Sequence, residues 1–447
     1  MNLIESARQL IATDSTPSQG TADVARLAGE LCREVGLETS FHPEQVDGRE
    51  EVNFLAWSKA SGYNGGLLLQ THLDTSPPGN FAMWGKTANN PFNASVHDDT
   101  IFGLGVAGAK MDFLAKILAV SEYANTTKFS RPLVLSGTFG HSNGMIGVNR
   151  LLRRKLVNPE MALVGEPTEL RLVAKGSGTA VLELSIPFSK EEKDYHRRHD
   201  VMESSSTQSK IFAGNETAKG SSSLSENAIL KMLTYLGHLP SGMVVMDLDG
   251  GTSALAQPEF AVLELDLVDG FNDTMIGKLN RIHRALMEME QDFSRYQNEG
   301  DHERPVINVG QIKTYPDEVR ISGACTLPPT VSDEQYQVWM ERLRQSCAEV
   351  GSTLRVVDYC AAFSADDKSQ LVSVSRQVMQ DMQLDPGLNI TSARTEASWL
   401  QRRGVNCLVF GPGKGTGNVH SPNENVSIAE VKKASEFYKR VIERVCL

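Results

Sequence analysis

A short apolar run, Leu67-Leu-Leu69, leads into His72-Leu-Asp74 and then into the turn-forming Pro77-Pro-Gly79. This pattern predicts a buried strand that carries His72 and Asp74 at its carboxyl end. In open α/β sheets, ligands bind at that end of the strands. A metal-binding imidazole usually donates its other ring N–H to a carboxylate, so the His-x-Asp spacing suits a metal site, although a purely structural histidine fits it equally well.

The segments around this run alternate between strand and helix patterns. Residues 132–139 and 161–164 are short apolar runs typical of buried strands, whereas residues 106–122 and 147–156 carry apolar side chains at helical spacing. Such alternation is typical of a sheet layered with helices. The sequence therefore predicts an α/β fold with a central, mostly parallel sheet.

The pattern changes after about residue 172. Residues 179–186 and 261–267 alternate between apolar and polar side chains, which predicts a sheet with one face in solvent. Between them, residues 189–225 are polar and rich in Ser, Lys and Glu, and we predict that this segment is mobile. This half of the chain indicates an α+β domain.

Chain length supports two domains, because 447 residues exceed what one hydrophobic core usually holds. Helical spacing returns at residues 371–382 and 426–445, which predicts that the chain goes back to the first domain. We predict one α/β domain from residues 1–171 and 361–447, and an inserted α+β domain from residues 172–360.

Composition limits the classes of partner. The formal net charge of −11 argues against a nucleic-acid partner, because phosphates are neutralised by basic side chains. No apolar run approaches membrane-spanning length, and the first ten residues have the pattern of an amphipathic helix rather than of a signal peptide. The six cysteines are scattered without a Cys-x-x-Cys pair, which favours reduced thiols in a cytoplasmic protein.

Six motifs follow one another along nearly the whole chain. They are His72-Leu-Asp74-Thr-Ser-Pro-Pro-Gly, Trp84 with Pro91-Phe92, Ile101-Phe-Gly-Leu-Gly105, Gly165-Glu-Pro-Thr168, Thr395-Glu-Ala397, and Phe410-Gly-Pro-Gly413 running to His420-Ser-Pro-Asn-Glu424. Together they resemble the dinuclear zinc peptidase and deacylase family of acetylornithine deacetylase, succinyl-diaminopimelate desuccinylase and glutamate carboxypeptidase. The resemblance implies a catalytic domain that holds two zinc ions and an inserted lid domain that usually forms a homodimer.

The resemblance also implies roles for particular side chains. His72, Glu166 and His420 match metal-ligand positions of the family, and Asp74 matches the carboxylate that supports a ligand histidine. A retained cleft implies a ligand that resembles an N-acyl amino acid or a small peptide.

Three carboxylates of the family pattern are missing. The bridging Asp of a Gly-Arg-Gly-x-x-Asp-x-Lys-Gly block falls on Gly108, and a Glu-Glu pair falls on His141 and Ser142. Two close cations need an anionic bridge, and a metal-activated water needs a proton acceptor. We therefore predict that two-metal hydrolysis is lost, with zero or one zinc ion bound rather than two.

The substrate contacts that the resemblance implies are altered as well. The family's lid histidine has no counterpart before Asn227-Ala-Ile229, which leaves Lys219 as the source of positive charge in that segment. Arg394 and Glu396 precede a helix and are either substrate contacts or capping charges.

Three hypotheses remain open. In the first, the chain is a pseudoenzyme, or a fold reused to bind a ligand or a protein partner. In the second, His72, Glu166 and either His141 or His420 hold one zinc ion for hydrolysis, with His141 as ligand or base, because two histidines and a carboxylate form a known catalytic set. Asp112 is a further candidate in that scheme. In the third, the chain is an ordinary deacylase that the motif alignment misplaces.

Overall fold

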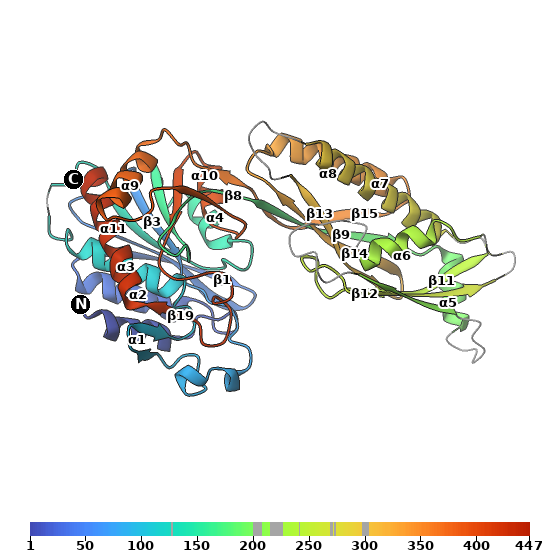
Figure 1. Ribbon diagram of the computed structural model, residues 1–447, viewed down its shortest axis with the longest axis horizontal. Coiled ribbons are helices and arrows are strands. Elements are labelled where there is room, and N and C mark those ends of the chain that lie inside the picture. The colour runs from blue at the N-terminus through green and yellow to red at the C-terminus, as the bar shows by residue number, and fades with distance from the viewer. Residues whose placement is uncertain are drawn as a thin grey trace. The chain divides into compact units, whose positions relative to one another are not determined.

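The computed structural model describes residues 1–126, 128–199, 208–214, 227–240, 242–268, 271, 274–296 and 304–447. These residues form two compact units (Figure 1). Unit 1 comprises Met1–Gly176 and Phe363–Leu447, and unit 2 comprises Ser177–Ala362. Each unit has its own hydrophobic core.

Unit 1 is built on a nine-stranded mixed sheet in the order β1, β2, β6, β3, β7, β18, β8 and β16, with β17 paired to β8. The strands are β1 (Glu38–Val46), β2 (Arg49–Trp57), β3 (Leu67–His72), β6 (Leu133–Thr138), β7 (Met161–Gly165), β8 (Leu172–Gly176), β16 (Phe363–Ser364), β17 (Leu388–Thr391) and β18 (Asn406–Phe410). The four central strands β6, β3, β7 and β18 run parallel, and β2 and β8 flank them antiparallel. The predicted α/β fold is confirmed, with the parallel strands at the centre of the sheet.

Helices cover both faces of this sheet. The main core takes in α1 (Leu3–Ala12), α2 (Ala22–Glu34), α3 (Ala109–Ser121), α9 (Gln370–Asp381) and α11 (Ile428–Cys446). On β3, Leu67 and Leu69 point into that core, whereas Leu68 is just as buried but lies outside it. Two further helices, α4 (Ile146–Arg153) and α10 (Ala397–Gln401), contact each other and neighbouring strands without joining the main core. Burial on both faces explains the apolar runs within the central strands.

A small sheet and two short helical turns complete the described part of unit 1. The sheet has three strands in the order β19 (Asn425–Ser427), β5 (Thr100–Phe102) and β4 (Ser95–His97). The turns are 3-10 helices at Phe81–Met83 and Gly85–Thr87. By pairing β19 with β5, this sheet joins the segment after His420 to the segment before Gly103.

Unit 2 is built on a seven-stranded antiparallel sheet in the order β10, β12, β11, β13, β14, β9 and β15. The strands are β9 (Gly178–Pro187), β10 (Gln208–Ala213), β11 (Met243–Gly250), β12 (Phe260–Leu267), β13 (Val306–Thr314), β14 (Glu318–Leu327) and β15 (Thr353–Cys360). Helices α6 (Ala228–Leu236), α7 (Met275–Arg295) and α8 (Asp333–Ala348) share its core. Residues of β9 alternate between buried and half-buried, as predicted for a sheet with one covered face.

Two details differ from the sequence predictions. Unit 2 begins at Ser177 rather than at residue 172, because β8 pairs with β18 in the sheet of unit 1. The polar segment 189–225, predicted to be mobile, contains α5 (Lys190–His199) and β10. Buried Glu192 accounts for the order of α5, since its carboxylate accepts hydrogen bonds from the backbone at the start of α7. The remainder of that segment lies outside the described residues.

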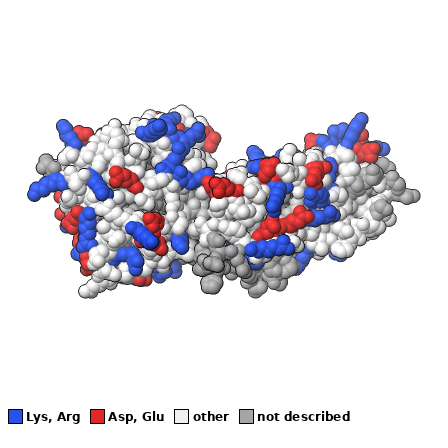
Figure 2. Space-filling model, turned by 90° about the horizontal axis from the view of Figure 1, so that it is seen from above, with Lys and Arg blue, Asp and Glu red and all other residues white. Residues whose placement is uncertain are grey.

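The surface charges and the cysteines agree with what the composition predicts. On the face seen in Figure 2, basic and acidic side chains are interspersed on both units. The described residues of that face show no large area that is basic alone. All six cysteines are buried, and none forms a disulfide. Among the described helices, none combines the length and the apolar character that membrane crossing requires.

Candidate metal centre

The candidate centre lies where the central parallel strands of unit 1 end. His72 is the last residue of β3, His141 follows β6, and Glu166 follows β7 directly. Neighbouring parallel strands end at one edge of a sheet, so these residues meet although they are far apart in sequence. Their ligand atoms all lie within 4.8 Å of one another.

His141 and Glu166 each point a polar atom into this centre. His141 Nδ1 and Glu166 Oε1 are 4.0 Å apart, and both atoms are buried without a hydrogen-bond partner. A gap of this size is too long for a hydrogen bond. It is wider than the roughly 3.4 Å between two ligands of one tetrahedral zinc ion, so a small inward movement of the two side chains would bring both atoms to one ion. The imidazoles of His72 and His141 stack with their centroids 4.2 Å apart. The donor set of two imidazoles and one carboxylate therefore fits zinc.

Asp74 orients His72. His72 Nδ1 lies 3.0 Å from the backbone oxygen of Asp74 and 3.5 Å from its carboxylate Oδ1. With Nδ1 facing these oxygens, Nε2 is the nitrogen that can bind a metal. A carboxylate behind a ligand histidine fixes the tautomer and raises ligand basicity.

The electrostatics of the three side chains differ. Burial opposes the charge on His72, but the hydrogen bond and charge of Asp74, together with the charges of nearby glutamates, raise its pKa to about 9. Burial and then the charge of His72 lower the pKa of His141 to about 3, which leaves a neutral imidazole. Burial raises the pKa of Glu166 to about 8. Since a metal binds deprotonated ligands, uptake of an ion by this group must release protons.

The centre opens into a cavity of about 650 Å³, and every residue that lines it belongs to unit 1. His420 is part of the cavity wall, is partly exposed to solvent, and has a left-handed backbone with φ of +61°. It does not belong to the three-residue group that could hold an ion. Gly108 also lines the cavity, and a Cβ built on it would meet only Pro167 Cδ, at 3.7 Å. No neighbouring atom therefore fills the space beside Gly108.

Comparison with known proteins places this geometry in a family. The family model for Peptidase family M20/M25/M40 matches residues 68–444. The chain belongs to this family. It is 33% identical over 184 residues to an acetylornithine deacetylase of Erwinia tasmaniensis, a match that covers 40% of this chain and 46% of that protein.

Solved structures of the M20 family share the fold. An aminoacylhistidine dipeptidase from Vibrio alginolyticus aligns with a TM-score of 0.65 at 14% identity, over 99% of this chain and 96% of that one. An M20 family metallo-carboxypeptidase from Sulfolobus solfataricus aligns with a TM-score of 0.61 at 14% identity, over 99% of each chain. The family resemblance inferred from the six sequence motifs is confirmed.

Asp112, the further ligand candidate from the sequence, is held by other side chains. It is buried, and both of its carboxylate oxygens are already bonded. The hydroxyl of Tyr438 donates to Oδ1, and Thr71 Oγ1 and Lys116 Nζ lie 2.6 and 2.7 Å from Oδ2. Asp112 is therefore a structural anion beneath the centre rather than a ligand.

The predicted substrate residues lie in different environments. Arg394 lines the cavity, and its charge is one of the lesser causes that lower the pKa of His141. Glu396 is buried behind the cavity wall, where its carboxylate accepts hydrogen bonds from Gln70 Nε2 at 2.6 Å and Thr138 Oγ1 at 2.7 Å. It is the N-cap residue of α10 but makes no side-chain capping hydrogen bond, and its charge is one of the causes that raise the pKa of His72. Lys219 lies outside the described residues.

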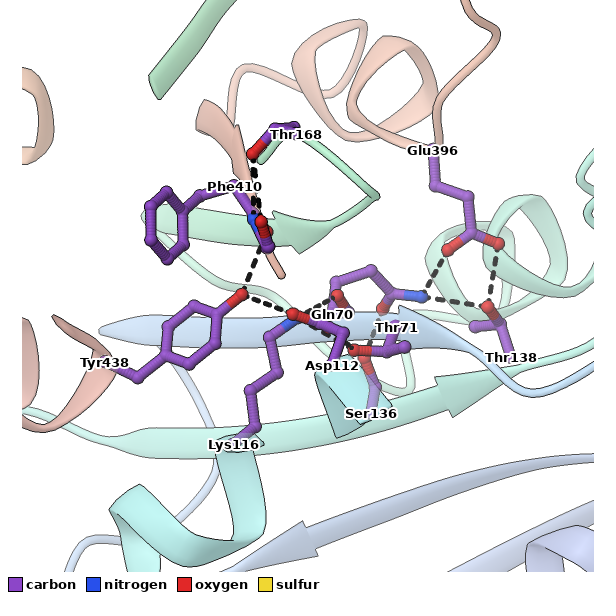
Figure 3. A network of polar contacts seen from close by, with 11 residues as sticks. Gln70, Thr71, Asp112, Lys116, Ser136, Thr138, Thr168, Glu396, Phe410 and Tyr438 are labelled. Carbon is purple, nitrogen blue, oxygen red and sulfur yellow. Dashed lines mark hydrogen bonds and ion pairs between the residues drawn. The ribbon is translucent and has the colours of Figure 1, made fainter. Parts of the chain in front are cut away.

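Sequence reasoning missed the network that supports the centre (Figure 3). It runs through Gln70, Thr71, Asp112, Lys116, Ser136, Thr138, Glu396 and Tyr438. One signal was available in the sequence. Besides His72, strands β3 and β6 contain four polar residues, Gln70, Thr71, Ser136 and Thr138, and a buried polar group needs a hydrogen-bonding partner.

Proposed function

We propose that this chain binds one divalent metal ion, zinc by its donor set, through His72, His141 and Glu166, and has lost the two-metal hydrolysis of its relatives. Its cavity would bind an N-acyl amino acid or a small peptide. The observation that carries the proposal is the convergence of these three ligand atoms in a cavity that Gly108 also lines, at the position where the family pattern has its bridging Asp.

The charges around the centre favour an ion. His141 Nδ1 and Glu166 Oε1 are buried polar atoms without a partner, and such atoms are costly unless something satisfies them. Asp74 and Glu396 add negative charge close by. A bound zinc ion would supply a Lewis acid that polarises a carbonyl oxygen. Around it, Asp74 fixes the ring of His72, and Arg394 offers the cavity a positive charge that suits an anionic ligand group.

A second candidate function is hydrolysis of an amide bond at this single site. The observation that favours it is His420 in the cavity wall, whose pKa is lowered by partial burial and by the charge of His72, so that the ring is neutral near pH 7. A neutral imidazole can accept a proton from an attacking water and pass it to the leaving amine. His141 would then be a ligand and His420 the base.

Metal content separates these proposals from a two-metal enzyme. The purified, tag-free chain is dialysed against trace zinc and analysed by inductively coupled plasma mass spectrometry, with a Glu166→Gln variant as control. We expect about one zinc per chain in the wild type and less in the variant. Two ions per chain would restore the ordinary two-metal enzyme, and none would contradict the metal site.

An activity screen then decides between the two functions. The zinc-loaded chain is incubated with a panel of N-acetyl amino acids and dipeptides, and released amine is measured. Turnover that disappears in His420→Gln while zinc content stays at one establishes the single-metal hydrolase. Binding of a panel member in calorimetry without amine release supports a binding protein.

A further inference from the structure

Asp112 and Lys116 form a buried ion pair within the polar network of unit 1 (Figure 3). Asp112 and Lys116 are one turn apart on α3, and their Oδ2 and Nζ atoms are 2.7 Å apart with both side chains inaccessible to solvent. Lys116 Nζ also donates to Gln70 O at 2.6 Å and to Thr71 Oγ1 at 2.8 Å. Three acceptors thus surround Nζ, which matches the three protons of a charged ammonium.

Strands β3 and β7, which lead directly to His72 and Glu166, both pack against this ion pair. Gln70 and Thr71 are the two residues before His72 on β3, and they accept the hydrogen bonds of Lys116. Gly165 is the residue before Glu166, and a Cβ built on it would lie 2.7 Å from Lys116 Nζ. One strand residue spans about 3.3 Å, so the ammonium lies within a few residue lengths of both ligands.

Lys116 is close enough for the carboxylates of the site to act on it. Burial lowers its pKa, and the charge and hydrogen bond of Asp112, followed by the charges of Glu166 and Glu396, oppose that effect. Buried charges are costly unless opposite charges offset them. Gln70 links Lys116 to Glu396, since its backbone oxygen accepts from Lys116 Nζ and its Nε2 donates to the Glu396 carboxylate (Figure 3).

We propose that Lys116 is a built-in counter-ion for Glu166 and Glu396, held in place by Asp112, and that it limits how tightly the site binds a divalent cation. Lys116 and Asp112 are positioning residues, since neither reaches the cavity. The effect on cation affinity rests on the proposed metal binding by His72, His141 and Glu166. The counter-ion effect in the metal-free chain is independent of that proposed function.

The two charges of the pair should act on the site in opposite directions. Removing the ammonium with Lys116→Met makes the centre more negative, so zinc affinity should rise at least about tenfold. Removing the carboxylate with Asp112→Asn leaves Lys116 uncompensated, so zinc affinity should fall by a similar factor. The double variant should lie between the two. A purely structural role would weaken zinc binding in both single variants.

Zinc affinity is measured by competition with a chromophoric chelator. The matched control is Lys110→Met, which removes a second buried lysine of the same helix. Lys110 Nζ bonds to Thr13 O, and its charge partners are Asp14 and Glu424 rather than Glu166. We expect this control to stay within about threefold of the wild type. Equal changes in both lysine variants, or the same sign in Lys116→Met and Asp112→Asn, would overturn the proposal.

Thermal unfolding of the metal-free chain tests the counter-ion without zinc. Lys116→Met should lower the Tm of unit 1 by at least about 5 °C, and by clearly less when Glu396→Gln has already removed one of the carboxylates. An equal loss in both backgrounds would show that Lys116 does not offset Glu396. Failure of the wild type to bind zinc would instead contradict the proposed function, and this second measurement would still decide the role of Lys116.

Discussion

Among single residues, His141 is the one on which the candidate centre depends most. Its Nδ1 is buried, unpartnered and 4.0 Å from Glu166 Oε1. We predict that His141→Ala lowers zinc affinity at least about 100-fold, because one of three protein ligands is lost. Chelator competition measures this, with Ser142→Ala as the neighbouring control that should change little. Comparable loss in both variants would argue that the loop, rather than the imidazole, governs binding.

Lys110, which is not one of the proposed metal ligands, should make the stability of the fold depend on pH. Burial lowers its pKa from the usual 10.5 to about 8, against the opposing charges of Asp14 and Glu424. Between these two pH values the unfolded chain binds more protons than the folded chain, so the stability contributed by this lysine rises with pH. Below pH 8 the lysine is charged in both states, and its penalty is constant.

The prediction for Lys110 compares urea unfolding of the wild type and Lys110→Met at pH 7.5 and pH 10. The wild type should gain about 2 kcal/mol relative to the variant over this interval. Lys439→Met serves as control, since Lys439 lies partly exposed beside Glu122. Its curve should run parallel to that of the wild type. A constant difference between wild type and Lys110→Met would contradict the shifted pKa.

At the scale of elements, the close packing of β7 on α3 depends on Gly165. A Cβ built on this last residue of β7 would lie 1.8 Å from Asp112 Oδ2 and 2.7 Å from Lys116 Nζ. We predict that Gly165→Ala lowers the free energy of unfolding of unit 1 by about 3 kcal/mol or more, because the buried pair has no space to move. Urea unfolding followed by circular dichroism measures the loss.

Gly277 of α7 is the matched control for this change. It is an exposed helical glycine, and a Cβ built on it would meet nothing within 4 Å. Gly277→Ala should stabilise unit 2 by about 0.5 kcal/mol through the lower entropy of its unfolded state. If Gly165→Ala proved equally harmless, α3 would have to pack against β7 more loosely than the structure indicates.

For the whole molecule, two separate cores imply two unfolding transitions. The candidate centre lies in unit 1, so zinc should raise only the transition of that unit, by about 2.7 kcal/mol at a free zinc concentration of 100 times Kd. Three of the four tryptophans, Trp57, Trp84 and Trp399, belong to unit 1, and Trp339 belongs to unit 2. Fluorescence of Trp339→Phe therefore follows unit 1 alone, and calorimetry follows both units. A single transition that moves as a whole with zinc would contradict independent cores.

Formation of a homodimer through unit 2 stays a prediction.

Much of the fold could be predicted from local sequence, because the central strands contain apolar runs and the helices that share the two cores have apolar faces. The strand that ends in His72 was predicted to within a residue, since its first three positions form an apolar run. The first unit boundary was placed five residues early. Pairing of β8 with β18, a strand more than 200 residues away, is invisible to local patterns.

The sequence by itself determined that the chain belongs with the M20 peptidases. It also predicts that Gly108, His141 and Ser142 stand where the family pattern has three carboxylates, and both inferences depend only on residue identity and order along the chain. Tertiary structure alone decided that His141 rather than His420 joins His72 and Glu166, and that Asp112 is bonded to Tyr438 and Lys116. The reason is that ligand groups and buried hydrogen bonds form between side chains brought together by strand order and helix packing. Spacing along the chain does not encode those distances.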